Sequence, residues 1–194
     1  MISKVLAFDT ATAHCAACLI IDDKIVVRVD PMAKGQAEHL MPMLEDVLVE
    51  NNLTWADLDA IGVGTGPGNF TGIRISVSAA RGLALGLGVP AIGVTHLEAQ
   101  VHGLARPVVA QVAAPRDHVY IQTFADIIST AVLVPAASDV AKIAPPIIAA
   151  EDMIQHIALI ARDRAPHVTE RPAPYYVRAA DAAPPRDAAP VILP

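Results

Sequence analysis

The sequence has little positive charge, few cysteines and no long apolar run. Only 14 of its 194 residues are Lys or Arg, against 20 Asp or Glu, so the formal net charge is -6. Such a chain is not expected to hold a polyanion by itself, because phosphate binding depends on clustered positive charge. Two cysteines provide no disulfide framework, so we expect a reducing, cytoplasmic location.

The apolar segments are too short for a membrane protein. The longest uncharged stretch, residues 82–97, has 16 residues including four glycines, whereas a helix needs about 20 to cross a bilayer. The apolar run after Lys4 stops at Asp9, which is too short for an export signal. Since 54% of the residues are hydrophobic, a buried core is assured, in one large domain or two small lobes.

The first half of the chain alternates between strand and helix patterns. Period-two apolar runs predict strands, and i, i+3, i+4 spacing predicts helices. Pro42 must lie in the first turn of its helix or kink it, and the sequence leaves both open. The predicted elements are strands 4–9, 16–21, 25–29, 60–63 and 91–94, helices 40–51, 73–87 and 95–104, and a capped turn at 54–57. This order is typical of an α/β domain with a mixed sheet.

The pattern weakens after Arg106-Pro107, where we predict the boundary between an N-terminal lobe, 1–105, and a smaller C-terminal lobe, 106–194. The second lobe is expected to hold strands 108–112 and 119–124 and a helix over 153–161. The last 30 residues contain seven prolines and no glycine. That tail should be extended, and either packed over the core or loose.

A glycine-rich loop, residues 64–72, lies between a predicted strand and a predicted helix. Backbone N–H groups at a helix start can bind an anion, but this loop lacks the lysine of a Walker loop and the spacing of a dinucleotide loop. A phosphate contact and a purely structural turn both stay open. Asn69 or Thr71 is expected to cap the helix that follows. The candidate contacts for a nucleotide or phosphate are Asp9, Thr10, Thr12, Gly66, Gly68 and Thr71.

Two further motifs are weaker. Cys15 and Cys18 form a CxxC pattern inside a predicted strand, where an offset of three places the side chains on opposite faces, so we interpret them as buried core residues. Ala79, Gly82 and Gly86 form a small-residue face on the second long helix. That face could serve close packing within the chain or contact with another subunit.

Three strings together resemble the TsaB family: Phe8-Asp9-Thr10, Glu38 to Pro42 and, most specifically, Gly64 to Ile75. Members of that family are non-catalytic partner subunits of TsaD in bacterial formation of threonylcarbamoyladenosine at position 37 of ANN-decoding tRNAs. The resemblance implies an actin-like ATPase fold (sugar kinase, Hsp70, actin; RNase H-like) with a mixed sheet and a reduced second lobe. It covers most of residues 1–104 and thin islands beyond.

The resemblance also bears on cofactors. TsaD carries a metal-binding HxxxH, of which this chain keeps His96 and has Gln100 at the second ligand position, so no metal site is expected. The family's phosphate motif is matched only at Asp9 and Thr12, because Ala11 replaces its glycine. We therefore expect no resident cofactor, with ATP or ADP at a subunit interface left open.

The partners implied by the resemblance are TsaD, a third subunit TsaE through the complex, and a second copy of the chain when it is alone. Contact with tRNA would be indirect. The family pairs through its first two helices, which here predicts an interface at Leu40, Met43, Leu44, Val47, Ala79, Gly82 and Gly86. The alternatives are a free-standing ATPase that uses Asp9 and residues 66–72, or a metallopeptidase that uses His96, Glu98 and His102.

Overall fold

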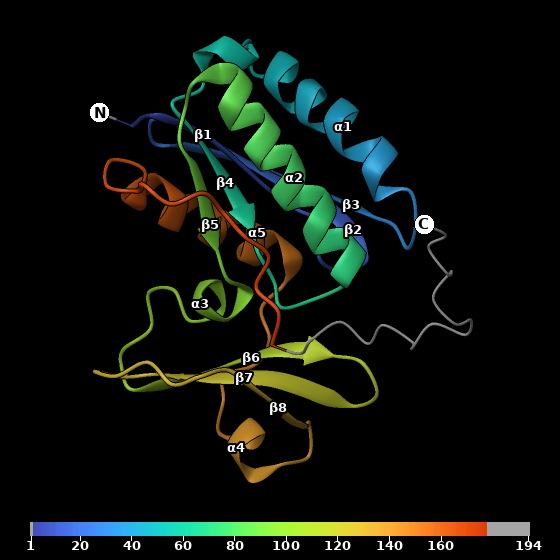
Figure 1. The fold of residues 1–194 in the computed structure, drawn as a ribbon, viewed down its shortest axis with the longest axis vertical. Helices are drawn as coiled ribbons and strands as arrows, with labels where there is room; N and C mark the ends of the chain where they lie inside the picture. The colour runs from blue at the N-terminus through green and yellow to red at the C-terminus, as the bar shows by residue number, and fades with distance from the viewer. Residues whose placement is uncertain (1, 178–194) are drawn as a thin grey trace, which may run out of the picture.

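Two β-sheets of unequal size make up the frame of the molecule (Figure 1). The structure is a computed structural model, and it describes residues 2–177. The larger sheet has five strands in the order β3-β2-β1-β4-β5. Its strands are β1 (Lys4–Asp9), β2 (His14–Ile21), β3 (Lys24–Pro31), β4 (Ala60–Gly64) and β5 (Ala91–Val94).

The larger sheet is mixed, as the sequence predicted. Strands β1, β2 and β3 form an antiparallel meander, in which Phe8 pairs with Ala17. Strands β4 and β5 are parallel to β1, and Phe8 is also in register with Val63 of β4. Because parallel strands end at the same edge of a sheet, the segments that follow β4 and β5 lie beside the segment that follows β1.

One face of this sheet is covered by helices α1 (Gln36–Glu50) and α2 (Phe70–Leu87), as Figure 1 shows. Their apolar stripes pack with Leu6, Phe8 and Leu19 into one core. Helix α1 begins one turn earlier than predicted, so Pro42 lies inside the helix and not in its first turn. The short turn at 54–57 is a 3-10 helix (Trp55–Asp57), and its capping box forms as predicted.

The opposite face is covered by helix α5 (Ala150–Arg164), which packs on β1, β2 and β4. Ile154, Ile157 and Ala161 join Val5, Ala7 and Ile20 in a second core. The sequence placed this helix in the second lobe, but its packing assigns it to the first sheet. The predicted boundary near residue 105 lies between the last strand of the larger sheet and the first strand of the smaller one, and α5 returns to the larger sheet.

The smaller sheet has three antiparallel strands in the order β6-β7-β8. Helix α3 packs against it through Leu97 and Val101, which contact a small core containing Ala110 and Phe124. Two short elements were missed in the sequence, a third strand and a four-residue helix. The elements here are α3 (His96–Gln100), β6 (Val108–Ala114), β7 (His118–Phe124), β8 (Val132–Pro135) and α4 (Asp139–Lys142).

After helix α5 the chain crosses back over the first sheet as an extended strap, residues 168–177. Pro172 is buried and lies beside Gly93, and the Tyr175 N–H donates to the carbonyl of Thr65 at 2.8 Å. The predicted tail is therefore packed over the core up to residue 177, and its remainder, 178–194, lies outside the described residues. No helix in the described part combines the length and apolar character needed to span a bilayer.

Candidate functional site

A polar junction lies where strands β1, β4 and β5 end. Asp9 closes β1, the glycine loop follows β4, and His96 begins α3 directly after β5. The His96 side chain reaches back so that its Nε2 lies 3.0 Å from Oδ1 of Asp9, 87 residues away in sequence. Both side chains are only 2% exposed. Sequence reasoning missed this pair, although both residues stand at the ends of strands that share one edge.

Every polar atom of the pair has a partner. The other ring nitrogen of His96, Nδ1, faces the carbonyl oxygen of Pro67 at 3.1 Å. The second carboxylate oxygen of Asp9 accepts from the Ala11 N–H at 3.1 Å and lies 3.5 Å from Nε2 of His14. Since a carboxylate and a carbonyl can only accept, both ring nitrogens of His96 must carry hydrogen. The junction is therefore a buried ion pair.

The ionisation of the two groups agrees with this geometry. Burial alone would raise the pKa of Asp9, but the charge of His96 and hydrogen bonds from His14 and His96 outweigh burial and hold that pKa well below its usual range. Burial alone would lower the pKa of His96, but the Asp9 carboxylate raises it. A protonated, enclosed imidazole cannot act as a general base on a substrate, and the pair links the end of β1 to the start of α3.

The glycine loop packs directly against the turn that follows β1. A Cβ on Gly68 would lie 2.5 Å from the Ala11 carbonyl oxygen, and one on Gly72 would lie 2.0 Å from that of Thr10. The Thr10 hydroxyl donates to the Gly72 carbonyl at 2.7 Å, and the Asn69 side chain caps helix α2 by accepting from the Gly72 N–H. The geometry supports the structural interpretation of these glycines and confirms Asn69 as the cap.

The structure shows where four of the six predicted nucleotide contacts lie. Asp9, Thr10 and Gly66 are buried and contact the chain itself, so they have no surface for a phosphate. Gly68 lies against Ala11.

Thr12 and Thr71 are exposed, and they line a cavity of about 500 Å³ together with Lys34, which lies just before helix α1. Of the six predicted contacts, these two are exposed. Their contact with a phosphate stays a prediction.

The metallopeptidase hypothesis required His96, Glu98 and His102 to converge, and the structure gives each a different partner. His96 pairs with Asp9, Glu98 forms an ion pair with Arg164, and the His102 ring lies 5.1 Å from that of His156. Gln100, at the second ligand position, forms hydrogen bonds with two backbone groups. Its side-chain amide donates to the Pro146 carbonyl, and its side-chain oxygen accepts from the Ile148 N–H. That arrangement contradicts the metallopeptidase hypothesis.

Cys15 and Cys18 lie on opposite faces of the larger sheet, as predicted. Cys15 packs in the core under helices α1 and α2, and Cys18 packs in the core under helix α5. Both are free thiols. Burial raises the pKa of Cys15 to about 11 and that of Cys18 to about 12, so neither is a reactive thiolate at neutral pH.

Four of the predicted interface residues pack within their own chain. They are the apolar stripe of helix α1, and each is at most 2% exposed because the stripe faces the sheet of its own chain: Leu40, Met43, Leu44 and Val47. A side chain that is already enclosed has no area left to bury against a partner. What helix α1 exposes is an acidic surface that also includes Met41 and Val49.

The small-residue face of helix α2 points away from the core of its own chain. Gly82 and Gly86 are exposed, and a Cβ on either would meet nothing within 4 Å. Leu85, between them, is 78% exposed. Close packing inside the chain therefore does not explain the two glycines. We call Ser78, Gly82, Leu85 and Gly86 the outer face of α2; Ala79 is half-buried at its edge.

The chain resembles several known proteins. It is 36% identical over 103 residues to the Escherichia coli "tRNA threonylcarbamoyladenosine biosynthesis protein TsaB", over 53% of this chain and 45% of that protein. An uncharacterized protein of Mycobacterium tuberculosis is 37% identical over 164 residues, 82% of this chain and 77% of that one. Residues 31–170 match the family model "TsaD: tRNA N6-adenosine threonylcarbamoyltransferase". The chain belongs to the TsaB branch of this family.

Solved structures agree with the TsaB assignment and the actin-like fold. A Pseudomonas aeruginosa structure described as "YeaZ" superposes with a TM-score of 0.70 at 25% identity, over 90% of this chain and 99% of that one. A second from the same organism, described as similar "to peptidase YEAZ", gives 0.71 at 26% identity, over 91% and 100%. In sequence, the chain spans about half the length of the TsaB relatives it matches, 45% in one and 51% in another.

Proposed function

We propose that this chain is a non-catalytic subunit in the formation of threonylcarbamoyladenosine at position 37 of ANN-decoding tRNAs, where it binds TsaD and holds it in an active conformation. TsaE would join through the complex, and contact with tRNA would be indirect. Membership of the TsaB branch supports the pathway, since TsaB relatives carry that pathway in their names.

The single observation that carries the docking proposal is the outer face of helix α2. It joins an exposed leucine to two glycines that leave open space where side chains would otherwise stand. Small residues let a second helix approach closely, and a large exposed aliphatic side chain offers apolar area to bury. A partner helix laid along this face would cover Leu85 and fit over Gly82 and Gly86.

The polar junction supports a subunit role in a different way. Asp9, the acid that an ATPase of this fold would aim at a phosphate, is enclosed and neutralised by His96. The net charge of -6 also favours a partner that supplies the basic tRNA-binding surface. A free-standing ATPase based on Asp9 is therefore disfavoured by the geometry of the junction.

The test is size-exclusion chromatography with light scattering on the chain alone and mixed with TsaD from the same organism. A one-to-one complex is expected, and purified TsaD should form threonylcarbamoyladenosine faster with the chain than without it. If the two proteins elute separately, with and without nucleotide, the proposal fails. ATP turnover by the purified chain alone would favour the ATPase alternative.

Variants of the outer face locate the interface. Gly82→Leu and Gly86→Leu should prevent close helix approach and abolish the complex, because the added side chains fill the open space. Leucine is a better helix former than glycine, which is about 0.8–1 kcal/mol less favourable than alanine, so the monomer should fold at least as well. Glu151→Leu, which places the same exposed side chain on helix α5, should leave the complex intact. Normal assembly of both glycine variants would place the interface elsewhere.

A further inference from the structure

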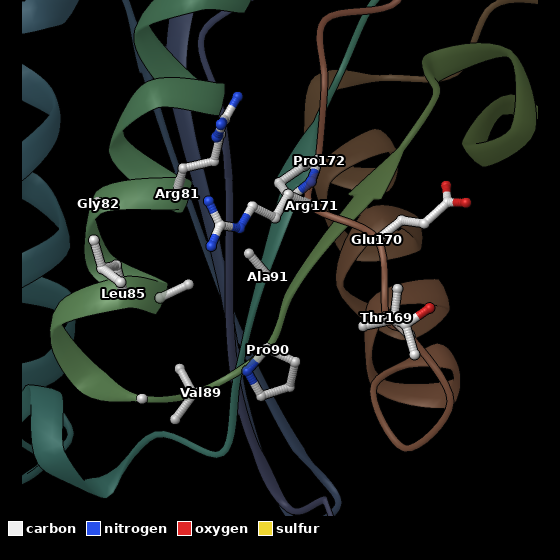
Figure 2. Close-up of a pocket in the computed structure, with 13 residues that line it drawn as sticks. Arg81, Gly82, Leu85, Val89, Pro90, Ala91, Thr169, Glu170, Arg171 and Pro172 are labelled. Atoms are coloured by element: carbon white, nitrogen blue, oxygen red, sulfur yellow. The ribbon is translucent and has the colours of Figure 1, made fainter.

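A cleft lies beside the outer face of helix α2, between its C-terminal half and the strap that returns after helix α5 (Figure 2). It encloses about 470 Å³. Helix α2 contributes Gly82 and Leu85 to one wall, and the strap contributes Pro172 to the other. Val89 and Pro90, just before β5, close the lower end. The cleft is therefore partly apolar and continuous with the outer face.

Two arginines line this cleft. Arg81 projects from helix α2, and Arg171 extends from the strap toward that helix (Figure 2). The carboxylate of Glu170, next to Arg171 in sequence, points away from the helix. Within residues 2–177, neither guanidinium has a carboxylate within ion-pair distance, although Arg28, Arg162 and Arg164 each have at least one. Two exposed, unpaired cations thus share one cleft in an acidic chain.

Docking of a partner on helix α2 would remove water from around these two guanidinium groups. A partner that covers Leu85 and Gly82 also covers part of the cleft, because the two surfaces share those residues. A guanidinium that loses water without gaining an anion opposes association, whereas one that meets a carboxylate through paired N–H groups favours it. Any partner that fits the outer face must therefore bring negative charge to the cleft.

We propose that the arginine cleft, Arg81 and Arg171 with the apolar wall of Gly82, Leu85, Val89 and Pro172, receives an acidic segment of the partner subunit. The segment places a carboxylate between the two guanidinium groups and an aliphatic side chain against Leu85 and Val89. This inference rests on the proposed docking of TsaD on helix α2, and it names the chemistry that TsaD must offer there.

The experiment measures the affinity of TsaD for the full chain by calorimetry, as a function of salt. Arg81→Gln and Arg171→Gln should each weaken binding about tenfold or more, which corresponds to about 1.4 kcal/mol, and the double variant should bind with a smaller salt dependence. Arg116→Gln is the matched control. It removes the same charge from an exposed turn between β6 and β7 and should bind like the wild type.

The outcomes separate the inference from the proposed function. If wild-type chain does not bind TsaD, the proposed function fails. If wild type binds and the cleft variants lose no more affinity than Arg116→Gln, the function stands and the cleft inference is overturned. If the cleft variants bind TsaD normally but weaken the affinity of the complex for tRNA, the cleft holds RNA phosphates and the inference is likewise overturned. All substituted side chains are exposed, so the variants are expected to fold.

Discussion

The junction at Asp9 and the outer face of helix α2 differ in whether their polar and apolar groups have partners within the chain. At the junction, two charges are enclosed at 2% exposure, and each polar atom has a partner within the chain. On helix α2, a leucine is 78% exposed and two glycines face open space. The first region is complete by itself, whereas the second leaves apolar area and open space at the surface.

The contrast separates features that the fold itself requires from features that it does not explain. Buried polar groups in native proteins are hydrogen-bonded, so a satisfied buried pair is explained by the needs of the fold. Exposed glycines inside a helix lower its stability, and no contact within the isolated chain compensates for that loss. The buried contacts of Asp9 and His96 are therefore accounted for within the chain, whereas Gly82, Leu85 and Gly86 carry the proposed contact.

Removal of His96 should have the largest effect on stability. His96→Ala leaves the Asp9 carboxylate buried without its opposite charge, and breaking a buried pair in this way costs about 3–5 kcal/mol. Urea denaturation measures the loss. His118→Ala, whose ring bonds only the Arg116 carbonyl near the surface, should cost about 1 kcal/mol or less. Equal losses in the two variants would show that the pair is not a special support of the fold.

The loss of stability in His96→Ala should depend on pH if it arises from the charges of Asp9 and His96. The folded pKa of Asp9 is lowered, so its contribution is present above the unfolded value of about 3.9 and is lost as the pH falls further. The folded pKa of His96 is raised, so its contribution is present below about 6.5 and is lost as the pH rises through the folded pKa. The gap between wild type and His96→Ala should therefore be widest between about pH 4 and 6.5. A flat gap would point to lost packing alone.

Two glycines at opposite ends of helix α2 test the contrast with one kind of substitution. Gly72→Ala places a Cβ 2.0 Å from the Thr10 carbonyl oxygen, so the loop must shift at a cost of about 1–3 kcal/mol. Gly86→Ala meets nothing within 4 Å and should stabilise the helix by about 0.5–1 kcal/mol. Thermal unfolding should move in opposite directions for the two variants. The same sign for both would contradict the division between a closed and an open end.

Local patterns were sufficient for much of the fold. The meander, strands β4 and β5, and the capped turn at 54–57 follow from apolar periodicity and capping residues, which act over a few neighbours. The opposite orientation of Cys15 and Cys18 follows from strand geometry alone. Helix α4 was missed because a single turn shows no apolar period, and strand β8 was missed because it exists through its pairing with β7, which no local pattern encodes.

The site was harder to predict because its contacts are long-range. Asp9 and His96 are 87 residues apart, and the signal that could have joined them is that both follow strands ending at the same edge. The stripe of helix α1 was recognised as apolar, but spacing does not tell whether a stripe faces its own sheet or a partner. Leu40 and Leu44 face the sheet. Burial in the folded chain decides that question.

The smallest expected effect on stability comes from Leu85, and it separates stability from docking. Leu85→Ala removes a side chain that is 78% exposed, so the free energy of unfolding should change by less than about 0.5 kcal/mol. Leu44→Ala, in the stripe first assigned to the interface, empties a fully buried site and should cost about 2–5 kcal/mol. Affinity for TsaD, measured where both variants are folded, should reverse this order, because Leu85 belongs to the outer face. Should Leu44→Ala weaken binding more than Leu85→Ala, helix α1 and not helix α2 would govern the contact.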